Sequence, residues 1–335
     1  MREIKITAND AGRRLDRFLR KYLREASLGE IYKFIRKDVK VNGKRKNESY
    51  MLEDGDVLTL YLSDETLEKL LGKPSGRIAS KRTFSIIFED ENVLAVSKPA
   101  GLLTHGDAEN KKDHLSNQVR DYLIAKGEYN PRTEKVFAPA PSGRLDRNTS
   151  GIILFGKNSG ALRELNRLMR DGGIEKYYLT IACGIIEERM ELGGALQKDE
   201  DANKVKITSS AGSADSKEIV TIVSPLRHLN YGPGLDATLC EIQLVTGRTH
   251  QIRAHLASIG HPVVGDAKYA EDTGKSAAAL NGFMRDNFSL STQFLHAARL
   301  EISGAEGSLS YLNGQVFEAP LPPKFETILN AGRQE

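Results

Sequence analysis

The sequence predicts an α+β fold in which a mixed, largely antiparallel sheet carries most of the protein. Segments rich in β-branched and aromatic residues follow one another at hairpin-like spacing, and helical patterns interrupt them in mixed order. The length of 335 residues, with 39% hydrophobic and 28% charged residues, is typical of about two globular domains. We therefore expect a small α/β domain over residues 1–63, a linker over residues 64–83 and a larger domain over residues 84–330.

The first domain is expected to contain two short helices and a small sheet. Two segments with apolar residues three and four apart and two strand-like segments predict these elements, at residues 15–22, 31–36, 39–44 and 57–62. Residues 1–50 contain 15 Lys and Arg residues against 7 Asp and Glu residues, a net charge of +8, whereas the rest has 33 against 38, a net charge of −5. A basic first domain on a slightly acidic body indicates that this domain binds a polyanion.

The linker and the larger domain follow from composition and periodicity. Residues 64–83 are polar, contain two Gly and one Pro, and have no sustained apolar period. The larger domain has seven segments with strand character, at residues 84–88, 93–96, 151–155, 177–182, 204–208, 218–223 and 237–245. Residues 159–169 predict a helix with Ser159 as its N-cap and apolar residues three and four apart. The polar stretch 110–135 is expected to shape access to the site.

The most informative motif is Arg144-Leu145-Asp146, which precedes a polar turn and the apolar run 151–155. An Arg and an Asp close together at the edge of a buried strand are typical of chemistry on an electron-poor or anionic substrate. The same tripeptide occurs at residues 14–16, but there the neighbouring apolar residues follow helical spacing, which places Asp16 on a helix surface. We therefore expect Asp146 to be the catalytic carboxylate.

A second polar motif covers residues 246–256 and directly follows the last strand-like segment. Thr246 or Thr249 is expected to cap a helix that begins there. A strand edge that leads into a polar helix N-terminus is well suited to hold an anion. We therefore place Arg253 beside the carboxylate of Asp146.

The sequence does not predict a zinc site, a membrane span or a signal peptide. His250, His255 and His261 are five and six residues apart, whereas a helical zinc pair needs a spacing of four and a neighbouring Glu. Cys183 and Cys240 lie in apolar stretches, which predicts two buried thiols. No run approaches the roughly 18 apolar residues of a membrane span, and the first residues lack the apolar segment of a signal peptide. We expect a cytoplasmic protein.

The order of short motifs along the chain resembles that of the RluA family of RNA pseudouridine synthases. The motifs are Lys98-Pro99-Ala100-Gly101-Leu102, Arg144-Leu145-Asp146-Arg147-Asn148-Thr149-Ser150-Gly151, Lys176-Tyr177-Tyr178, Gly247-Arg248-Thr249-His250-Gln251-Ile252-Arg253-Ala254-His255-Leu256, Gly265-Asp266 and Leu295-His296-Ala297. Residues 12–62 resemble the alpha-L RNA-binding module. The resemblance implies a catalytic sheet with a central cleft, an RNA substrate, and no metal or organic cofactor. Gly143 stands where the family often has His, which puts a role for an imidazole there in doubt.

The resemblance also implies roles for individual residues. Asp146 is the nucleophile, which attacks either the anomeric carbon of the target ribose or the uracil ring. A base inside a helix must be extruded at a cost of about a few kcal/mol. Arg144 helps to eject the uridine and occupies its space, while Tyr178 packs on the flipped base and takes part in proton transfer. Arg253 pairs with Asp146 and favours its charged form.

The remaining expectations concern the RNA. Arg248, His250 and the cations of the first domain are expected to bind it; those cations are Arg13, Arg17, Lys33, Arg36, Lys37 and Lys40. The basic module together with this body favours large-subunit ribosomal RNA as the target. Transfer RNA, or a non-catalytic role in RNA binding or ribosome assembly, are the alternatives. We expect a monomer that has neither a metal nor a membrane as a partner.

Overall fold

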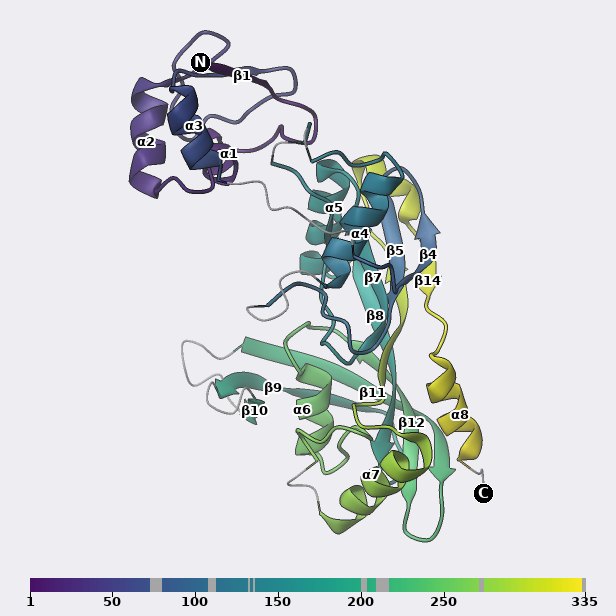
Figure 1. The fold of residues 1–335 in the computed structure, drawn as a ribbon. Helices are drawn as coiled ribbons and strands as arrows, with labels where there is room; N and C mark the ends of the chain where they lie inside the picture. The colour runs from purple at the N-terminus through teal and green to yellow at the C-terminus, as the bar shows by residue number, and fades with distance from the viewer. Residues whose placement is uncertain are drawn as a thin grey trace. The chain divides into compact units, whose positions relative to one another are not determined.

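The structure is a computed structural model that describes residues 1–72, 80–107, 113–131, 133–134, 136–199, 204–208, 217–270 and 274–332 (Figure 1). These residues form two compact units. Unit 1 takes its residues from the ranges 1–82, 116–140 and 156–163, and unit 2 from the ranges 83–115, 141–155 and 164–335. Each unit has a sheet of its own.

Unit 1 contains a three-stranded antiparallel sheet and three helices from the first part of the chain. The strands are β1 (Arg2–Lys5), β2 (Val39–Val41) and β3 (Val57–Leu60), in the order β1-β3-β2, and the helices are α1 (Leu15–Tyr22), α2 (Leu28–Lys37) and α3 (Asp64–Leu71). Leu15, Phe18 and Leu19 of α1 are fully buried in one core with Ile31 of α2. The two helices and two strands predicted for this region are therefore confirmed, whereas β1 was not predicted.

The predicted linker is wrong in its first half, because helix α3 occupies residues 64–71. Ser63 caps this helix, since its hydroxyl accepts a hydrogen bond from Thr66 N at 3.3 Å. Leu67 and Leu70, three residues apart, are buried in the core of unit 1. Leu71 also packs against this core, so three apolar side chains at positions i, i+3 and i+4 hold the two-turn helix. This pattern covers only five residues and was missed in the sequence. Residues 73–79 of the linker lie outside the described residues.

The polar stretch 110–135, which was expected to shape access to the site, contains helix α4 (Leu115–Ala125). Leu115, Val119 and Leu123 are buried at a spacing of four residues, which gives α4 an apolar stripe. Residues 108–112, 132 and 135 lie outside the described residues. The helix predicted at residues 159–169 is α5 (Ser159–Asp171). The predicted Ser159 cap is wrong, because Asn158 Oδ1 accepts the capping hydrogen bond from Ala161 N at 2.9 Å.

Unit 2 is built on a large mixed sheet with the strand order β10-β9-β11-β12-β8-β13-β7-β5-β4, in which β6 also pairs with β7 and β14 with β13. The strands are β4 (Ser85–Glu89), β5 (Val93–Lys98), β6 (Ala140–Pro141), β7 (Ser150–Gly156), β8 (Ile174–Cys183), β9 (Met190–Asp199), β10 (Lys204–Thr208), β11 (Lys217–Asn230), β12 (Asp236–Leu244), β13 (Leu295–Ile302) and β14 (Val316–Glu318). The β4–β5, β8–β12, β8–β13, β9–β10, β9–β11, β11–β12 and β13–β14 pairs are antiparallel, and β7–β13 is parallel. The predicted fold class is confirmed, and each of the seven segments predicted as strands overlaps a strand.

The parallel pair β7–β13 lies inside this sheet, between β5 and β8, and β7 directly follows the Asp146 loop. Gly151 is required there: its φ is +115°, and a Cβ atom would lie 2.1 Å from the backbone oxygen of Ala297. Next to it, the fully buried imidazole of His296 lies 3.2 Å from the Ala319 oxygen through Nε2 and 2.8 Å from Ser150 Oγ through Nδ1. Because a carbonyl only accepts, Nε2 carries the proton and Nδ1 accepts from the Ser150 hydroxyl. The start of β7 is thus tightly fixed.

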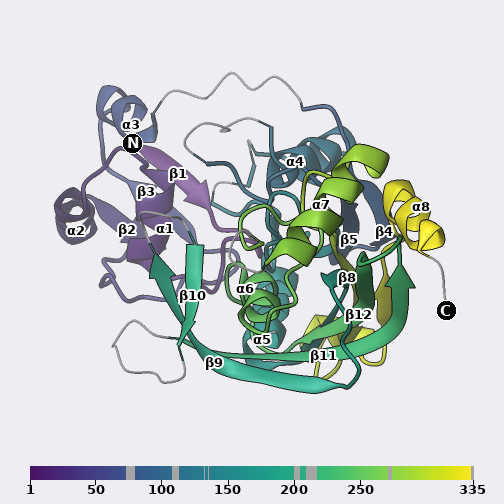
Figure 2. The ribbon, with the colours of Figure 1, turned by 90° about the horizontal axis from the view of Figure 1, so that it is seen from below.

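Unit 2 also contains helices that follow β12 in the sequence. They are α6 (Gln251–Ser258), α7 (Lys275–Phe288) and α8 (Pro323–Ala331), and a 3-10 helix covers Gly307–Leu312. Figure 2 shows α6 and α7 on one side of the curved strands β9, β11 and β12. Leu280 and Met284 of α7 are buried in one core with Phe325 and Ile328 of α8 and Ile181 of β8.

Candidate active site

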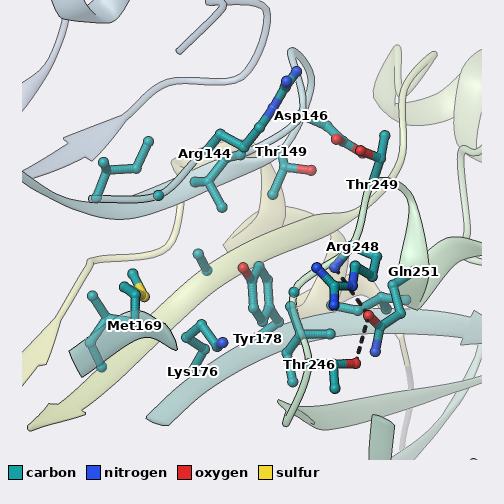
Figure 3. A pocket seen from close by; sticks show the side chains of 18 of the residues that line it. Arg144, Asp146, Thr149, Met169, Lys176, Tyr178, Thr246, Arg248, Thr249 and Gln251 are labelled. Atoms are coloured by element: carbon teal, nitrogen blue, oxygen red, sulfur yellow. Dashed lines mark hydrogen bonds between the residues drawn. The ribbon is translucent and has the colours of Figure 1, made fainter. Parts of the chain in front are cut away.

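A pocket of about 580 Å³ lies over strands β12, β8, β13 and β7, which are neighbours in the sheet of unit 2. Two loops complete it: residues 142–149 precede β7, and residues 245–250 lead from β12 into α6. Figure 3 shows Asp146 and Arg248 on these two loops, and Tyr178 of β8 in the same pocket. The predicted cleft therefore lies over the centre of the sheet.

Hydrogen bonds within the Asp146 loop and from Thr104 to this loop fix the position of Asp146. The hydroxyl of Thr104 accepts a hydrogen bond from Leu145 N at 3.2 Å and donates to Leu145 O at 3.0 Å. Thr149 N donates to Asp146 O at 3.1 Å, which closes a turn. The Asp146 side chain is 19% exposed, and its Oδ2 lies 3.3 Å from Arg253 Nη1 and 3.7 Å from His250 Nε2. The carboxylate is therefore accessible to a ligand yet paired with a cation.

Arg253 connects this carboxylate to a second, deeper one. Its Nε and Nη2 donate to the two carboxylate oxygens of Asp266 at 2.6 and 2.8 Å, and its Nη1 donates to Asp146 at 3.3 Å. Burial opposes the charge, but the hydrogen bonds and charge of Asp266 and the charge of Asp146 outweigh it and raise the pKa of Arg253. Asp266 thus fixes the guanidinium through a bidentate pair, and the remaining nitrogen is aimed at Asp146.

The predicted cap of helix α6 is wrong. The N-cap residue is His250, in the left-handed region at φ +56°, and no side chain caps the helix. Thr246 instead donates from Oγ1 to Gln251 Oε1 at 2.9 Å, and Gln251 Oε1 also accepts from Arg248 N at 3.1 Å (Figure 3). Gln251 Nε2 donates to Val220 O at 3.0 Å. A buried glutamine therefore orders the loop, and local sequence favoured the more common Thr cap.

Tyr269 supports both His250 and Arg253, and the sequence analysis did not single it out. Its hydroxyl lies 3.1 Å from His250 Nδ1 and accepts from Val205 N of β10 at 3.0 Å. The Arg253 guanidinium lies over its ring, 5.0 Å from the centroid. Burial lowers the pKa of His250, while the charge of Asp146 partly opposes this, so the imidazole beside the carboxylate is neutral near pH 7.

Lys98, the first residue of the motif at 98–102, connects this motif to the Asp146 loop. Its side chain is fully buried, and Nζ donates to the oxygens of Pro99, Leu102 and Arg147 at 2.9, 2.8 and 3.0 Å. Burial lowers the pKa of Lys98 to about 7, while the charge of Asp146 acts in the opposite direction. The ammonium group thus fastens the turn 99–102 to the residue that follows Asp146.

Tyr178 and Lys176, both on β8, line the same pocket. Tyr178 is 8% exposed, and burial together with the charge of Asp146 raises the pKa of its phenol well above the usual range. It is therefore protonated at neutral pH and can donate a hydrogen bond. Burial lowers the pKa of Lys176. Both side chains lie in the pocket in Figure 3.

The other predicted residues fall into two groups. Arg144 and Arg248 line the pocket and are exposed, and His250 lines it as well. The predicted cations of the first domain lie in unit 1 and do not line this pocket: Arg17, Lys33, Arg36 and Lys37 are exposed, and Arg13 and Lys40 are half-buried. The structure therefore brings Asp146, Arg253 and Tyr178 together and leaves the six cations in another unit.

The prediction that Asp16, in the first Arg-Leu-Asp copy, lies on an exposed helix surface is wrong. Asp16 is 8% exposed and accepts from Arg14 Nε and Nη2 at 3.1 and 2.8 Å. It also accepts from Arg17 N at 2.7 Å, at the N-terminus of α1, where a negative charge is favourable. Asp16 therefore stabilises this helix.

Three further observations concern the part of the chain that the structure describes. Within it, no group of three or more His, Cys, Asp or Glu residues is arranged to hold a metal ion. Nor does it contain a helix whose length and apolar character would allow it to cross a membrane. Cys183 and Cys240 are buried free thiols, as predicted.

Comparison with known proteins identifies the family. Residues 92–258 match the family model of RNA pseudouridylate synthases. The ribosomal large subunit pseudouridine synthase C of Vibrio cholerae is 30% identical over 338 residues, which cover 99% of this chain and 96% of the relative. The protein of the same name from Escherichia coli is 32% identical over 309 residues, covering 90% and 88%.

A solved structure supports the fold. Human RNA Pseudouridylate Synthase Domain Containing 4 matches with a TM-score of 0.55 and 21% identity, over 73% of this chain and 92% of the human one. The sequence matches, which span nearly the whole chain, carry the assignment. The chain belongs to the RluA family of RNA pseudouridine synthases, enzymes that isomerise uridine to pseudouridine in RNA.

Proposed function

We propose that this enzyme modifies uridines in large-subunit ribosomal RNA and that Asp146 is its nucleophile. The names of the relatives from Vibrio cholerae and Escherichia coli support the choice of RNA. The net charge of +8 in residues 1–50 supports a large polyanionic substrate. The observation that carries the role of Asp146 is the Arg253 guanidinium, which holds Asp266 with two nitrogens and Asp146 with the third.

The pocket explains how a uridine is held once it leaves the RNA helix. Arg144 is exposed and makes no hydrogen bond or ion pair with the residues that the structure describes, so it is available to fill the place of the extruded base. The aromatic ring of Tyr178 offers a stacking surface inside the pocket. These two side chains divide the work of extrusion and of holding the base.

The chemistry is an isomerisation without a change in composition. The bond between the ribose anomeric carbon and N1 of uracil breaks, the ring rotates, and a bond forms from the same anomeric carbon to C5. The proton that C5 loses is balanced by the proton that N1 gains. Asp146 attacks the anomeric carbon or the uracil ring, and Arg253 keeps the carboxylate charged and oriented for either route.

The role of Asp146 is tested with Asp146→Asn on uridine carrying tritium at C5. We expect tritium release to fall by at least about 10³-fold, because the amide is not a nucleophile, while RNA affinity and the thermal midpoint stay unchanged. Asp286→Asn, at a side chain that is 69% exposed, is the matched control and should keep full activity. Tritium release by Asp146→Asn at the wild-type rate would rule out the nucleophile.

The choice of RNA is tested by mapping pseudouridines across total RNA from cells with and without the gene. We expect one or more uridines of large-subunit ribosomal RNA to lose the modification, and a plasmid encoding Asp146→Asn to leave them unmodified. Loss confined to transfer RNA would overturn the proposed target but not the enzyme. No change in any RNA would instead favour a binding or assembly role.

A further inference from the structure

Unit 1 gathers basic side chains from three segments that are far apart in the sequence. Arg13 precedes α1, Lys21 and Arg24 lie at its end, Arg120 lies on α4, and Arg163 lies on α5. All five belong to the same compact unit. We refer to these five residues as the cation cluster.

The members of the cation cluster are close enough to repel one another. The pKa of Lys21 is lowered by loss of water around its ammonium group and by the charges of Arg13, Arg120 and Arg24, against the opposing charge of Asp10. The pKa of Arg13 is lowered by burial and by the charge of Arg163, again against Asp10. Like charges at such short range destabilise the free protein unless an anion joins them.

The carboxylate that opposes this repulsion has other partners. Asp10 is fully buried, and its Oδ1 accepts hydrogen bonds from Val136 N at 3.2 Å and Phe137 N at 3.1 Å. Its charge is therefore shared with two backbone amides. At Lys21 the charges of Arg13 and Arg120 each outweigh that of Asp10, so positive charge is in excess around this ammonium group.

One guanidinium nitrogen of the cation cluster also lacks a hydrogen-bond acceptor. Arg13 Nε is buried and has no hydrogen-bond partner among the described residues. Arg163 Nη1 donates to Ser159 Oγ at 3.1 Å and Ala11 O at 3.4 Å, which keeps its guanidinium next to residues 11–13. A buried guanidinium nitrogen without a partner costs free energy that a bound oxyanion removes.

We propose that the cation cluster binds phosphates of the RNA backbone, so that residues of α4 and α5 act together with the first domain in holding the substrate. This inference rests on the proposed RNA substrate. It adds Lys21, Arg120 and Arg163 to the predicted contacts, and none of the five residues lines the pocket around Asp146. Because phosphates are the same in every sequence, this site supplies affinity and register but no choice of uridine.

The test compares the double variant Lys21→Gln/Arg120→Gln with the control Lys69→Gln/Lys275→Gln, which removes two exposed cations outside the cluster. RNA affinity is measured at several salt concentrations with an unmodified fragment of large-subunit ribosomal RNA and with an unrelated hairpin. Each lost phosphate contact should reduce the slope of log affinity against log salt by about 0.7 to 0.9, equally for both RNAs. The control should keep the wild-type slope.

Catalysis and stability give independent readouts. We expect KM for the ribosomal fragment to rise while kcat at saturating RNA is unchanged, and the thermal midpoint at low salt to stay the same or rise, because repulsion is relieved. Arg120→Lys should keep the slope of the wild type, since the charge is retained. An unchanged slope in the double variant overturns the proposed phosphate site, and a lower thermal midpoint with that unchanged slope would assign the cluster a structural role. If the wild type fails to make pseudouridine, the proposed function is lost, but the slope still tests this site.

Discussion

Replacing Arg253 with Met is expected to destabilise the protein strongly, because Asp266 is then buried without a counter-ion. The Asp266 side chain is 1% exposed and the Arg253 side chain 8% exposed. Removing one partner of such a buried ion pair costs about 3 to 5 kcal/mol. In a domain of about 200 residues each kcal/mol lowers Tm by about 2 to 4 °C, so we expect a fall on the order of 10 °C.

A second variant separates this structural role from the catalytic one. Arg253→Met/Asp266→Asn removes the buried charge together with its counter-ion, and the amide oxygen can still accept from Lys268 N, which lies 3.1 Å from Asp266 Oδ1. Most of the lost Tm should therefore return. Activity should stay at least about 100-fold below the wild type, because Asp146 still lacks its guanidinium.

The measurements are thermal unfolding followed by circular dichroism and tritium release from RNA labelled at C5 of uridine. Arg285→Met is the control, since its partner Asp286 is 69% exposed and an exposed pair contributes little. Recovery of both Tm and activity in the double variant would refute the reasoning, because Arg253 would then serve only to neutralise Asp266. An unchanged Tm in Arg253→Met would refute the value assigned to the buried pair.

Two further predictions concern the strand and the loop on either side of Asp146. Gly151→Ala should lower the free energy of unfolding, measured in urea, by at least about 2 kcal/mol, because the φ of Gly151 is +115° and the new methyl group would meet the Ala297 oxygen. Gly193→Ala is the control and should not lower it, because a Cβ atom at Gly193 would have no atom within 4 Å. Lys98→Met tests the buried ammonium group. Between pH 7 and 10.5 only the unfolded wild type holds this proton, so the unfolding free energy of the wild type should rise by about 1.4 kcal/mol per pH unit relative to that of the variant. If the unfolding free energies of the two proteins change equally with pH, a pKa of about 7 for Lys98 is contradicted.

The fold class and many elements were predictable because their signals are local. The apolar run at residues 151–155 and the helical period at 159–169 give β7 and α5 with boundaries shifted by at most two residues. Helix α3 was missed because its apolar pattern covers only Leu67, Leu70 and Leu71, which pack on a core formed by other parts of the sequence. The central place of β13 was not predicted either, since nothing in residues 295–302 specifies β7 as a partner.

The site residues that belong to sequence motifs were predictable, whereas the residues that support them were not. The motif resemblance placed Asp146, Arg253 and Tyr178 in one pocket, and the structure has all three there. The support of that pocket depends on contacts between distant segments: the ring of Tyr269 under Arg253 joins residues 16 positions apart, and the Lys98 ammonium reaches Arg147 across 49. Such contacts follow from the topology of the chain and have no signature in its local sequence.

The location of β13 between β7 and β8 sets the order in which the enzyme can assemble during translation. Until residues 295–302 emerge from the ribosome, each of those two strands keeps an open edge, and open edges readily pair with other chains. Pairing between distant segments is also slow. A nascent chain that ends at residue 294 thus already contains both loops of the pocket but lacks β13, the strand that joins β7 to β8. The active site can therefore be completed only late in synthesis.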